Sequence, residues 1–528
     1  MHKSILSGLL ALQLAVPAIG AQFDPYFADL SWQAPRTLSD WDNLTVTTET
    51  GTFVGLLNDT YPNVRQFLRV PFAEPPVGKL RWMPPVYPKK SDEKIDSTFF
   101  GPSCPQFVSG SASIWNQYQP PNPTINLGQP LNAGAVAWGS AEDCLSLAIW
   151  TPADADKHSN LPVALFVTGG GGKTGGVNIP SQLPSDWVSR SQEHIVVTIN
   201  YRANIFGNPM SRALETNSLT LLDVRAAVEW VHKNIENFGG DRDNIMLWGQ
   251  SQGSALTHMY TLAWPENPLV HKFGIISQPP NVRVNLTDTP DPYTNFDYLA
   301  KALGCNYGND SRAEFNCMQQ ISFVQIEETV NNWNKTPSIA FNLYIPDEKY
   351  IFSNETERYL TGQVAKGPAI RSNTATELPT EGNLTESIAD SLSWTCTSYK
   401  ESVLRYNAGL DTYRYFYGGN FTNISPVPWL GAFHWSDLLM IFGTYRKDAG
   451  RVSQLEIDTS ETMQDAILAF LKDPETIGPV AGWPLFNPNG TDGGAMLEFG
   501  RGVPVRNVSG DYVEAACWNS SARFPYNG

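Results

Sequence analysis

The chain has little basic charge, no metal-type cysteine spacing and no apolar run long enough to cross a bilayer, which takes about 20 residues. Its 36 basic residues face 52 acidic ones, a formal charge of −16, which argues against nucleic acid or anionic membrane as a partner. None of its six cysteines forms a C-x-x-C pair. A low-complexity linker and an internal repeat are also missing, so we expect one large domain.

The first residues have the pattern of a secretory signal peptide. Lys3 supplies the positive charge, Ile5 to Val16 an apolar core, and Ala18 to Ala21 a small-residue cleavage site. We therefore expect residues 1–21 to be removed, leaving a secreted, soluble protein with a single domain over 22–528. In an exported chain the six cysteines are read as three disulfides.

Twelve asparagines have Ser or Thr two residues on and are candidate glycosylation sites. They are Asn43, Asn58, Asn285, Asn309, Asn334, Asn354, Asn383, Asn420, Asn423, Asn489, Asn507 and Asn519.

The most informative stretch is Gly249-Gln250-Ser251-Gln252-Gly253, a G-x-S-x-G turn. The apolar run from Ile245 to Trp248 predicts a buried strand before it, and residues 254–262 predict a helix after it. Glycines let strand and helix approach closely, and the sharp turn lifts the serine hydroxyl out of the sheet. In this strand–turn–helix context the pattern predicts a nucleophile elbow at Ser251.

Further strands and helices surround this turn. Residues 161–168, 195–200 and 273–277 predict buried strands, and Leu219 to Asn234 has helical apolar spacing. Their alternation predicts β-α-β units and a mostly parallel sheet.

A glycine-rich turn, Gly169 to Gly176, follows the strand over residues 161–168. A phosphate cradle would need the Walker spacing, which is missing. A purely structural turn is a second alternative. The favoured interpretation is an oxyanion hole, because glycines let backbone N–H groups converge on one oxygen.

Two longer segments, Val64 to Trp82 and Ser140 to Leu147, closely resemble signatures of the type-B carboxylesterase/lipase family, which includes cholinesterases and fungal lipases. The resemblance continues in the family's order through Trp518. It implies an α/β-hydrolase fold, with a large mostly parallel central sheet flanked by helices, and hydrolysis of small-molecule esters by a Ser-Glu-His triad. It also implies that Gly170, Gly171 and Gln252 donate the oxyanion-hole N–H groups.

The general base is expected at His434. In this fold class the acid and then the histidine follow the serine in the chain. His258 and His271 also follow Ser251, but they lie too close to it to leave room for an acid. The segment around His434 resembles the family's histidine loop.

The acid is expected at Glu377 rather than Glu381. Residues 367–377 resemble the family's strand and acid loop, with Glu377 at the catalytic offset from Pro368. The family has Gly after the acid, whereas Leu378 follows Glu377, and a Glu-Gly pair occurs at Glu381-Gly382. Strand spacing fixes where a side chain emerges, which favours Glu377.

The resemblance also implies a disulfide scheme and an ion pair. The expected disulfides are Cys104–Cys144, Cys305–Cys317 and Cys396–Cys517. Arg81 and Glu142 would pair at the base of the first disulfide loop.

The chain departs from the family pattern near the expected site. Thr168 replaces His or Tyr, Gly172 an aromatic residue and Gln252 an alanine, while Gln278-Pro279-Pro280 replaces Gln-Ser-Gly. The last change leaves a supporting hydroxyl near the acid in doubt. Loss of a ring at Gly172, with a longer polar side chain at Gln252, predicts a pocket for esters that are bulky near the carbonyl and carry a polar group.

The sequence thus predicts a secreted serine esterase with an acyl-enzyme intermediate and without metal or cofactor. An acyltransferase using the same triad is the alternative, and a non-catalytic binding protein is a further one. The loop from Cys104 to Cys144 lacks a clear amphipathic helix, which favours soluble or moderately apolar esters over those of an interfacial lipase.

Overall fold

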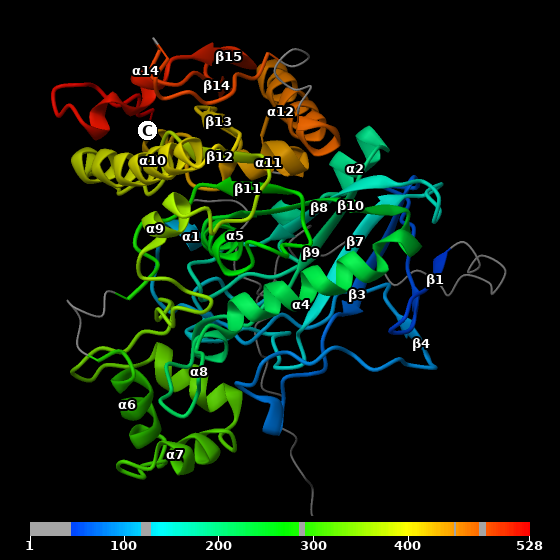
Figure 1. The fold of residues 1–528 in the computed structure, drawn as a ribbon, viewed down its shortest axis with the longest axis vertical. Helices are drawn as coiled ribbons and strands as arrows, with labels where there is room; N and C mark the ends of the chain where they lie inside the picture. The colour runs from blue at the N-terminus through cyan, green and yellow to red at the C-terminus, as the bar shows by residue number, and fades with distance from the viewer. Residues whose placement is uncertain are drawn as a thin grey trace, which may run out of the picture. The chain divides into compact units, whose positions relative to one another are not determined.

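A ten-stranded sheet forms the centre of the computed structural model, which describes residues 44–117, 128–284, 291–447, 450–474, 482–490 and 492–527 (Figure 1). Across the sheet the strands run β15 (Val505–Val508), β14 (Met496–Phe499), β13 (Thr412–Tyr417), β12 (Ala369–Thr374), β11 (Lys272–Ile276), β10 (Gly240–Gln250), β8 (Leu161–Val167), β9 (Ile195–Ile199), β7 (Ser146–Pro152) and β3 (Val64–Pro71). The pairs from β14 through β9 are parallel, and the pairs of β15, β7 and β3 with their neighbours are antiparallel.

The middle strands are buried on both faces because their apolar runs supply two cores. Along β8, Val163 and Leu165 belong to one core while Phe166 belongs to the other. Along β10, Leu247 and Trp248 divide in the same way, as the alternation of side chains in a strand requires. Fully buried strands of this kind occupy the middle of a parallel sheet covered by helices on both faces.

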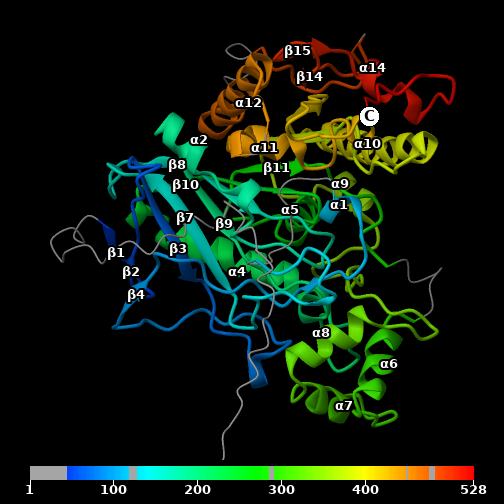
Figure 2. The same cartoon turned by 180° about the vertical axis from the view of Figure 1, so that it is seen from behind.

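Helices cover both faces of the sheet. Helices α4 (Leu219–Asn234) and α5 (Gln252–Ala263) pack on one face, and α2 (Ser185–Ser191), α11 (Ser436–Phe442) and α12 (Gln454–Lys472) on the other (Figures 1 and 2). Helix α10 (Leu384–Asn407) packs against β12 and α9 (Glu355–Leu360). The expected mostly parallel sheet flanked by helices is confirmed.

A third core lies away from the sheet. Helices α6 (Thr294–Ala302), α7 (Ser311–Met318) and α8 (Phe323–Asn331) enclose it together with Trp82 (Figure 1). The remaining α-helices and strands that the structure describes are α1 (Ile114–Gln117), α3 (Asn204–Gly207), α14 (Gly510–Glu514), the sheet of β1 (Thr45–Thr47), β2 (Thr52–Val54) and β4 (Lys94–Asp96), and the hairpin of β5 (Phe107–Val108) and β6 (Ala135–Val136).

Several expectations fall beyond these residues. The signal peptide over residues 1–21 and the sequons at Asn43 and Asn285 lie outside the described part of the chain. Among the helices that are described, none has the length and apolar character to cross a membrane.

Candidate active site

Ser251 stands between the last residue of β10 and the first residue of α5. Its backbone has φ 56° and ψ −125°, a conformation that costs a non-glycine residue about 1–3 kcal/mol. The N–H of Ser251 donates to the carbonyl of Ile276 on the neighbouring strand at 2.9 Å, so the surrounding sheet holds the turn in place. The local structure is the strand–turn–helix that the G-x-S-x-G pattern of a nucleophile elbow predicts.

Both glycines of the elbow are required by close packing. A Cβ on Gly249 would lie 2.4 Å from the carbonyl carbon of Gly253, and a Cβ on Gly253 would lie 2.0 Å from the carbonyl oxygen of Val167. Neither position tolerates a side chain unless α5 moves away from the sheet. The G-x-S-x-G spacing is therefore a packing requirement of this turn.

Glu377 lies just beyond β12 and is fully buried. One carboxylate oxygen, Oε2, lies 2.5 Å from Nδ1 of His434. The other, Oε1, accepts from the N–H of Thr374 at 2.8 Å and from Nδ2 of Asn373 at 3.2 Å. Glu381 is exposed. Of the two candidate acids, Glu377 makes the hydrogen bond to the imidazole.

A serine hydroxyl also contacts this carboxylate, although the family's Gln-Ser-Gly is replaced. Ser277, the residue before Gln278, donates from Oγ to Oε1 of Glu377 at 2.8 Å. The replacement of Gln-Ser-Gly by Gln278-Pro279-Pro280 therefore does not deprive Glu377 of a hydroxyl partner. The hydroxyl comes from the position directly after β11, where Ser277 has φ 48°.

His434 precedes α11 and is 5% exposed. The ring of Trp394, on α10, meets the imidazole edge to face with centroids 4.6 Å apart. The amide nitrogen of Gln250 lies 3.0 Å from Nε2 and 3.4 Å from Nδ1 of His434. Because it is nearly equidistant from two nitrogens separated by one carbon, this amide lies over the ring and not along either lone pair.

Sequence reasoning missed Gln250 and Trp394 as neighbours of the histidine. For Gln250 a signal existed, since it directly precedes Ser251 in the elbow. For Trp394 none existed, because α10 approaches the histidine loop only through the tertiary fold.

The glycine turn presents free backbone donors. Gly170 and Gly171 have positive φ values of 123° and 61°, and their N–H groups make no hydrogen bond within the described residues. The N–H of Gln252 begins α5 and so lacks an intrahelical partner. An attacked carbonyl oxygen is stabilised by donors of this kind, aided by the positive end of the helix dipole.

The positions of Gly172 and Gln252 do not support the expected pocket for a bulky, polar ester. A Cβ on Gly172 would lie 3.3 Å from the carbonyl oxygen and 3.4 Å from Cβ of Asn342, so Asn342 already occupies the space beside the turn. The Gln252 side chain is 3% exposed and donates from Nε2 to the hydroxyl of Tyr344 at 2.7 Å. Its amide nitrogen is thus bonded to the scaffold.

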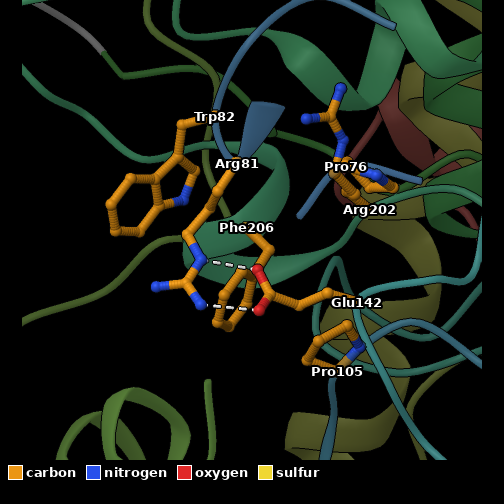
Figure 3. A pocket seen from close by; sticks show the side chains of 7 residues that line it. All are labelled: Pro76, Arg81, Trp82, Pro105, Glu142, Arg202 and Phe206. Carbon is orange, nitrogen blue, oxygen red and sulfur yellow. Dashed lines mark hydrogen bonds and ion pairs between the residues drawn. The ribbon is translucent and has the colours of Figure 1, made fainter. Parts of the chain in front are cut away.

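Arg81 and Glu142 form a two-pronged ion pair, with Nε–Oε1 at 2.5 Å and Nη2–Oε2 at 2.6 Å (Figure 3). The rings of Trp82 and Phe206 flank the guanidinium, which also donates to the carbonyl of Ile321. This group joins the base of the first disulfide loop to the segment between α7 and α8. The pocket that it lines leaves no room for a ligand.

The six cysteines are joined in the three pairs that the resemblance implies. The Cys104–Cys144 bond closes the loop that contains the β5–β6 hairpin. The Cys305–Cys317 bond links α7 to the end of α6. The Cys396–Cys517 bond attaches the C-terminal segment to α10.

One group of side chains in the described ranges has metal-ligand chemistry, formed by His258, Glu355 and Glu401. Both carboxylates already have cationic partners, since Arg283 lies 2.6 Å from Glu355 and Arg371 2.5 Å from Glu401. Arg371 also donates to Nδ1 of His258, whose Nε2 faces Glu355 at 3.2 Å. The group is a salt-bridge network between α5, α9 and α10, in which each carboxylate is already paired with an arginine.

One further carboxyl lies close to the histidine loop. Burial raises the pKa of Asp437, on α11, to about 6, and the hydroxyl of Tyr415 donates to its Oδ2 at 2.8 Å. At acid pH this carboxyl is therefore predominantly neutral, which limits the negative charge beside Glu377.

The described sequons are not equivalent. Asn58 is half-buried and eight others have exposed side chains: Asn309, Asn334, Asn354, Asn383, Asn420, Asn489, Asn507 and Asn519. Asn423 is different, because it is 8% exposed and its Nδ2 donates to Oε1 of Glu456 at 2.9 Å. The same nitrogen donates to the carbonyl of Tyr445 at 3.3 Å, so a glycan, which replaces one of its two hydrogens, would break one of these bonds. Burial and these bonds disfavour Asn423 relative to the exposed sequons.

Comparison with known proteins finds matches along most of the chain. A family model described as the carboxylesterase family matches residues 42–382. Chlorogenic acid esterase from Aspergillus niger is 38% identical over 502 residues, covering 89% of this chain and 93% of the relative. Secreted lipase 5 from Gibberella zeae is 36% identical over 489 residues, covering 84% and 88%. Acetylcholinesterase from Bungarus fasciatus is 31% identical over 272 residues, covering 51% and 42%.

Proposed function

Because the chain belongs to the carboxylesterase family and is a carboxylic ester hydrolase, we propose that it works through Ser251, His434 and Glu377 by way of an acyl-enzyme. The observation that carries this proposal is the contact between Nδ1 of His434 and Oε2 of Glu377 at 2.5 Å. A carboxylate in that position favours the tautomer that carries its proton on Nδ1, so that Nε2 can act as the base.

The chemical steps follow from these positions. Nε2 of His434 takes the hydroxyl proton as Ser251 attacks the ester carbonyl, and the imidazolium is stabilised by Glu377. The N–H groups of Gly170, Gly171 and Gln252 stabilise the oxyanion as it forms. His434 then protonates the leaving alcohol and later activates the water that releases the acid.

We further propose that the substrate is a small, soluble ester. The relative covered over 93% of its length is a chlorogenic acid esterase, while a relative of nearly equal identity is a lipase. The first disulfide loop has only the four-residue α1 as a helix in its described part, and so gives no support for a lipid-binding lid there. A series running from chlorogenic acid through short-chain esters to long-chain triacylglycerol tests this, since preference for the last would contradict it.

Export is part of the same proposal. Residues 1–21 would act as a signal peptide and residues 22–528 would form one domain that carries the site. Secreted lipase 5 is named as a secreted protein. N-terminal sequencing of protein recovered from culture medium tests the cleavage position after Ala21.

The triad is tested most directly with a fluorophosphonate, which labels an activated serine. We expect the label on the peptide that contains Ser251, and its loss in Ser251→Ala. Product analysis with water and an added alcohol as competing acceptors would reveal an acyltransferase through a dominant new ester. An unlabelled, inactive wild-type protein would instead indicate a binding protein.

A further inference from the structure

We propose that Gln106 is a positioning residue that ties the Cys104–Cys144 loop to the oxyanion turn, an inference that rests on the function proposed above. Gln106 is 2% exposed and lies two residues after Cys104. Its Nε2 donates to the carbonyl of Gly175 at 2.8 Å, and its Oε1 accepts from the N–H of Gly175 at 3.2 Å. The carboxamide therefore satisfies both backbone groups of one residue of the turn.

Gly175 lies directly against the start of the same turn. It has φ 120°, and a Cβ there would lie 2.4 Å from the carbonyl oxygen of Gly169. Likewise a Cβ on Gly170 would lie 2.2 Å from the carbonyl oxygen of Thr174. The two limbs of the turn are thus in backbone contact, and a displacement of Gly175 must move the limb that contains Gly170.

The remaining hydrogen bonds of the turn fix its tip. The carbonyl of Gly170 accepts from the N–H groups of Lys173 and Thr174, and the N–H of Asn204 donates to the carbonyl of Gly172 at 2.7 Å. These bonds engage carbonyl groups and leave the N–H groups of Gly170 and Gly171 available. Gln106 holds the returning limb at Gly175, between the contacts that Asn204 makes with the carbonyl of Lys173 at 3.5 Å and Asn200 with the N–H of Val177 at 3.0 Å. The aim of the Gly170 and Gly171 donors therefore depends on Gln106.

The other end of the connection is the base of the disulfide loop. Nε2 of Gln106 also donates to the carbonyl of Cys104 at 3.1 Å, and the carbonyl of Gln106 accepts from the N–H of Ala137 at 2.8 Å. Asn204 adds a second link, since its Nδ2 donates to the carbonyl of Pro105 at 2.9 Å. The base of the loop, at Cys104 to Gln106, and the oxyanion turn are consequently joined by hydrogen bonds.

The loop provides a matched control in Gln129, which is 4% exposed. Its Nε2 donates to the carbonyl of Val136 at 3.1 Å, and its Oε1 accepts from the N–H of Trp138 at 3.0 Å. Gln129 thus makes the same two-sided bond to backbone within the same loop, and both of these partners belong to the loop itself. Gln106→Leu and Gln129→Leu remove comparable contacts, but only the first releases Gly175.

The test compares these two variants with the wild type in kcat, KM, thermal midpoint and inhibition by a trifluoromethyl ketone, whose serine adduct places an oxyanion in the hole. Loss of one oxyanion donor costs about 10²–10³ in kcat, and a displaced donor should cost less. We expect Gln106→Leu to lower kcat about tenfold or more and to weaken the inhibitor in parallel, with KM within about twofold. Gln129→Leu should lower the thermal midpoint similarly but change kcat less than about twofold.

A second variant keeps the test decisive if Gln106→Leu does not fold. Gln106→Glu retains an acceptor for the N–H of Gly175 and loses both donated bonds while it is ionised. Its activity relative to the wild type should rise as pH falls, because the protonated carboxyl can donate again. Equal kcat losses in the Gln106 and Gln129 variants, or no pH-dependent recovery in Gln106→Glu, would overturn the inference.

Failure of the positioning role of Gln106 can be distinguished from failure of the proposed function. If Ser251→Ala keeps its activity, the triad proposal is wrong whatever Gln106 does. If Ser251→Ala is inactive while Gln106→Leu behaves like Gln129→Leu, only the positioning role is rejected.

Discussion

Oε2 of Glu377 lies 2.5 Å from Nδ1 of His434, while Oε1 of the same carboxylate accepts hydrogen bonds from three other groups. The three donors are the hydroxyl of Ser277, the N–H of Thr374 and the amide of Asn373. These donors hold the carboxylate in one orientation independently of the histidine. The carboxylate can therefore fix the orientation of the imidazole.

Replacing the proposed acid, Glu377, should therefore disable the enzyme, whereas replacing the exposed Glu381 should not. We expect Glu377→Gln to lower kcat roughly 10³-fold or more, because an amide favours the wrong imidazole tautomer. Glu381→Gln should stay within about twofold of the wild type. Steady-state kinetics on one ester decides the assignment, which is wrong if the Glu381 variant is the inactive one.

Ser277 provides a graded test of the same carboxylate. Ser277→Ala removes one of three donors to Oε1, so we expect kcat to fall by about tenfold or less. The double variant with Glu377→Gln should lose no more than Glu377→Gln alone, because groups that act through one another are not additive. Additive losses in this cycle would show that Ser277 acts elsewhere.

Gly172→Phe should slow short and bulky esters alike. The position has φ 70°, and its Cβ would meet the backbone of Asn342, so a side chain disturbs the turn itself. We expect a loss of about tenfold or more on both an acetate and a branched-acid ester. Gly172→Ala is the control, since it adds only the Cβ and should show most of the same loss. A loss confined to the branched ester would restore the substrate-size interpretation of this position.

These cases show which features the sequence could predict. Local patterns were sufficient to predict the turn at Ser251 and the central strands. Burial on both faces requires a continuous apolar run, and close packing at the turn requires glycine at fixed positions, so both features can be read from adjacent residues. The boundaries differed slightly, with β10 beginning at Gly240 rather than Ile245 and α5 at Gln252 rather than Ser254.

Contacts between distant segments could not be predicted in this way. The sequence alone suggested an empty space at Gly172, but a segment 170 residues further along the chain fills it with Asn342. The hydroxyl on Glu377 was questioned because its usual motif is missing, yet Ser277 reaches the same oxygen. Each outcome depends on which distant segment the tertiary fold places next to the residue. The residues around Gly172 or Glu377 alone do not indicate which segment that is.

The last prediction concerns stability and a carboxyl outside the proposed triad. Glu327, on α8, is 1% exposed, and burial raises its pKa to about 7, while Nδ2 of Asn331 donates to its Oε2 at 2.9 Å. A carboxyl whose pKa is higher in the folded than in the unfolded state stabilises the fold fully only below the unfolded value. Its contribution is lost as pH rises from about 4.5 to about 7, by up to about 3 kcal/mol.

Glu327→Gln removes this titration while keeping the shape of the side chain. We therefore expect its stability relative to the wild type to increase as pH rises from about 4.5 to about 7 and to level off above that. Urea unfolding at a series of pH values measures the difference. Glu328→Gln, at the exposed neighbouring position, is the control and should show little pH-dependent change. A difference for Glu327→Gln that is constant across this range would mean that Glu327 titrates normally, because only a raised pKa makes the two proteins diverge with pH.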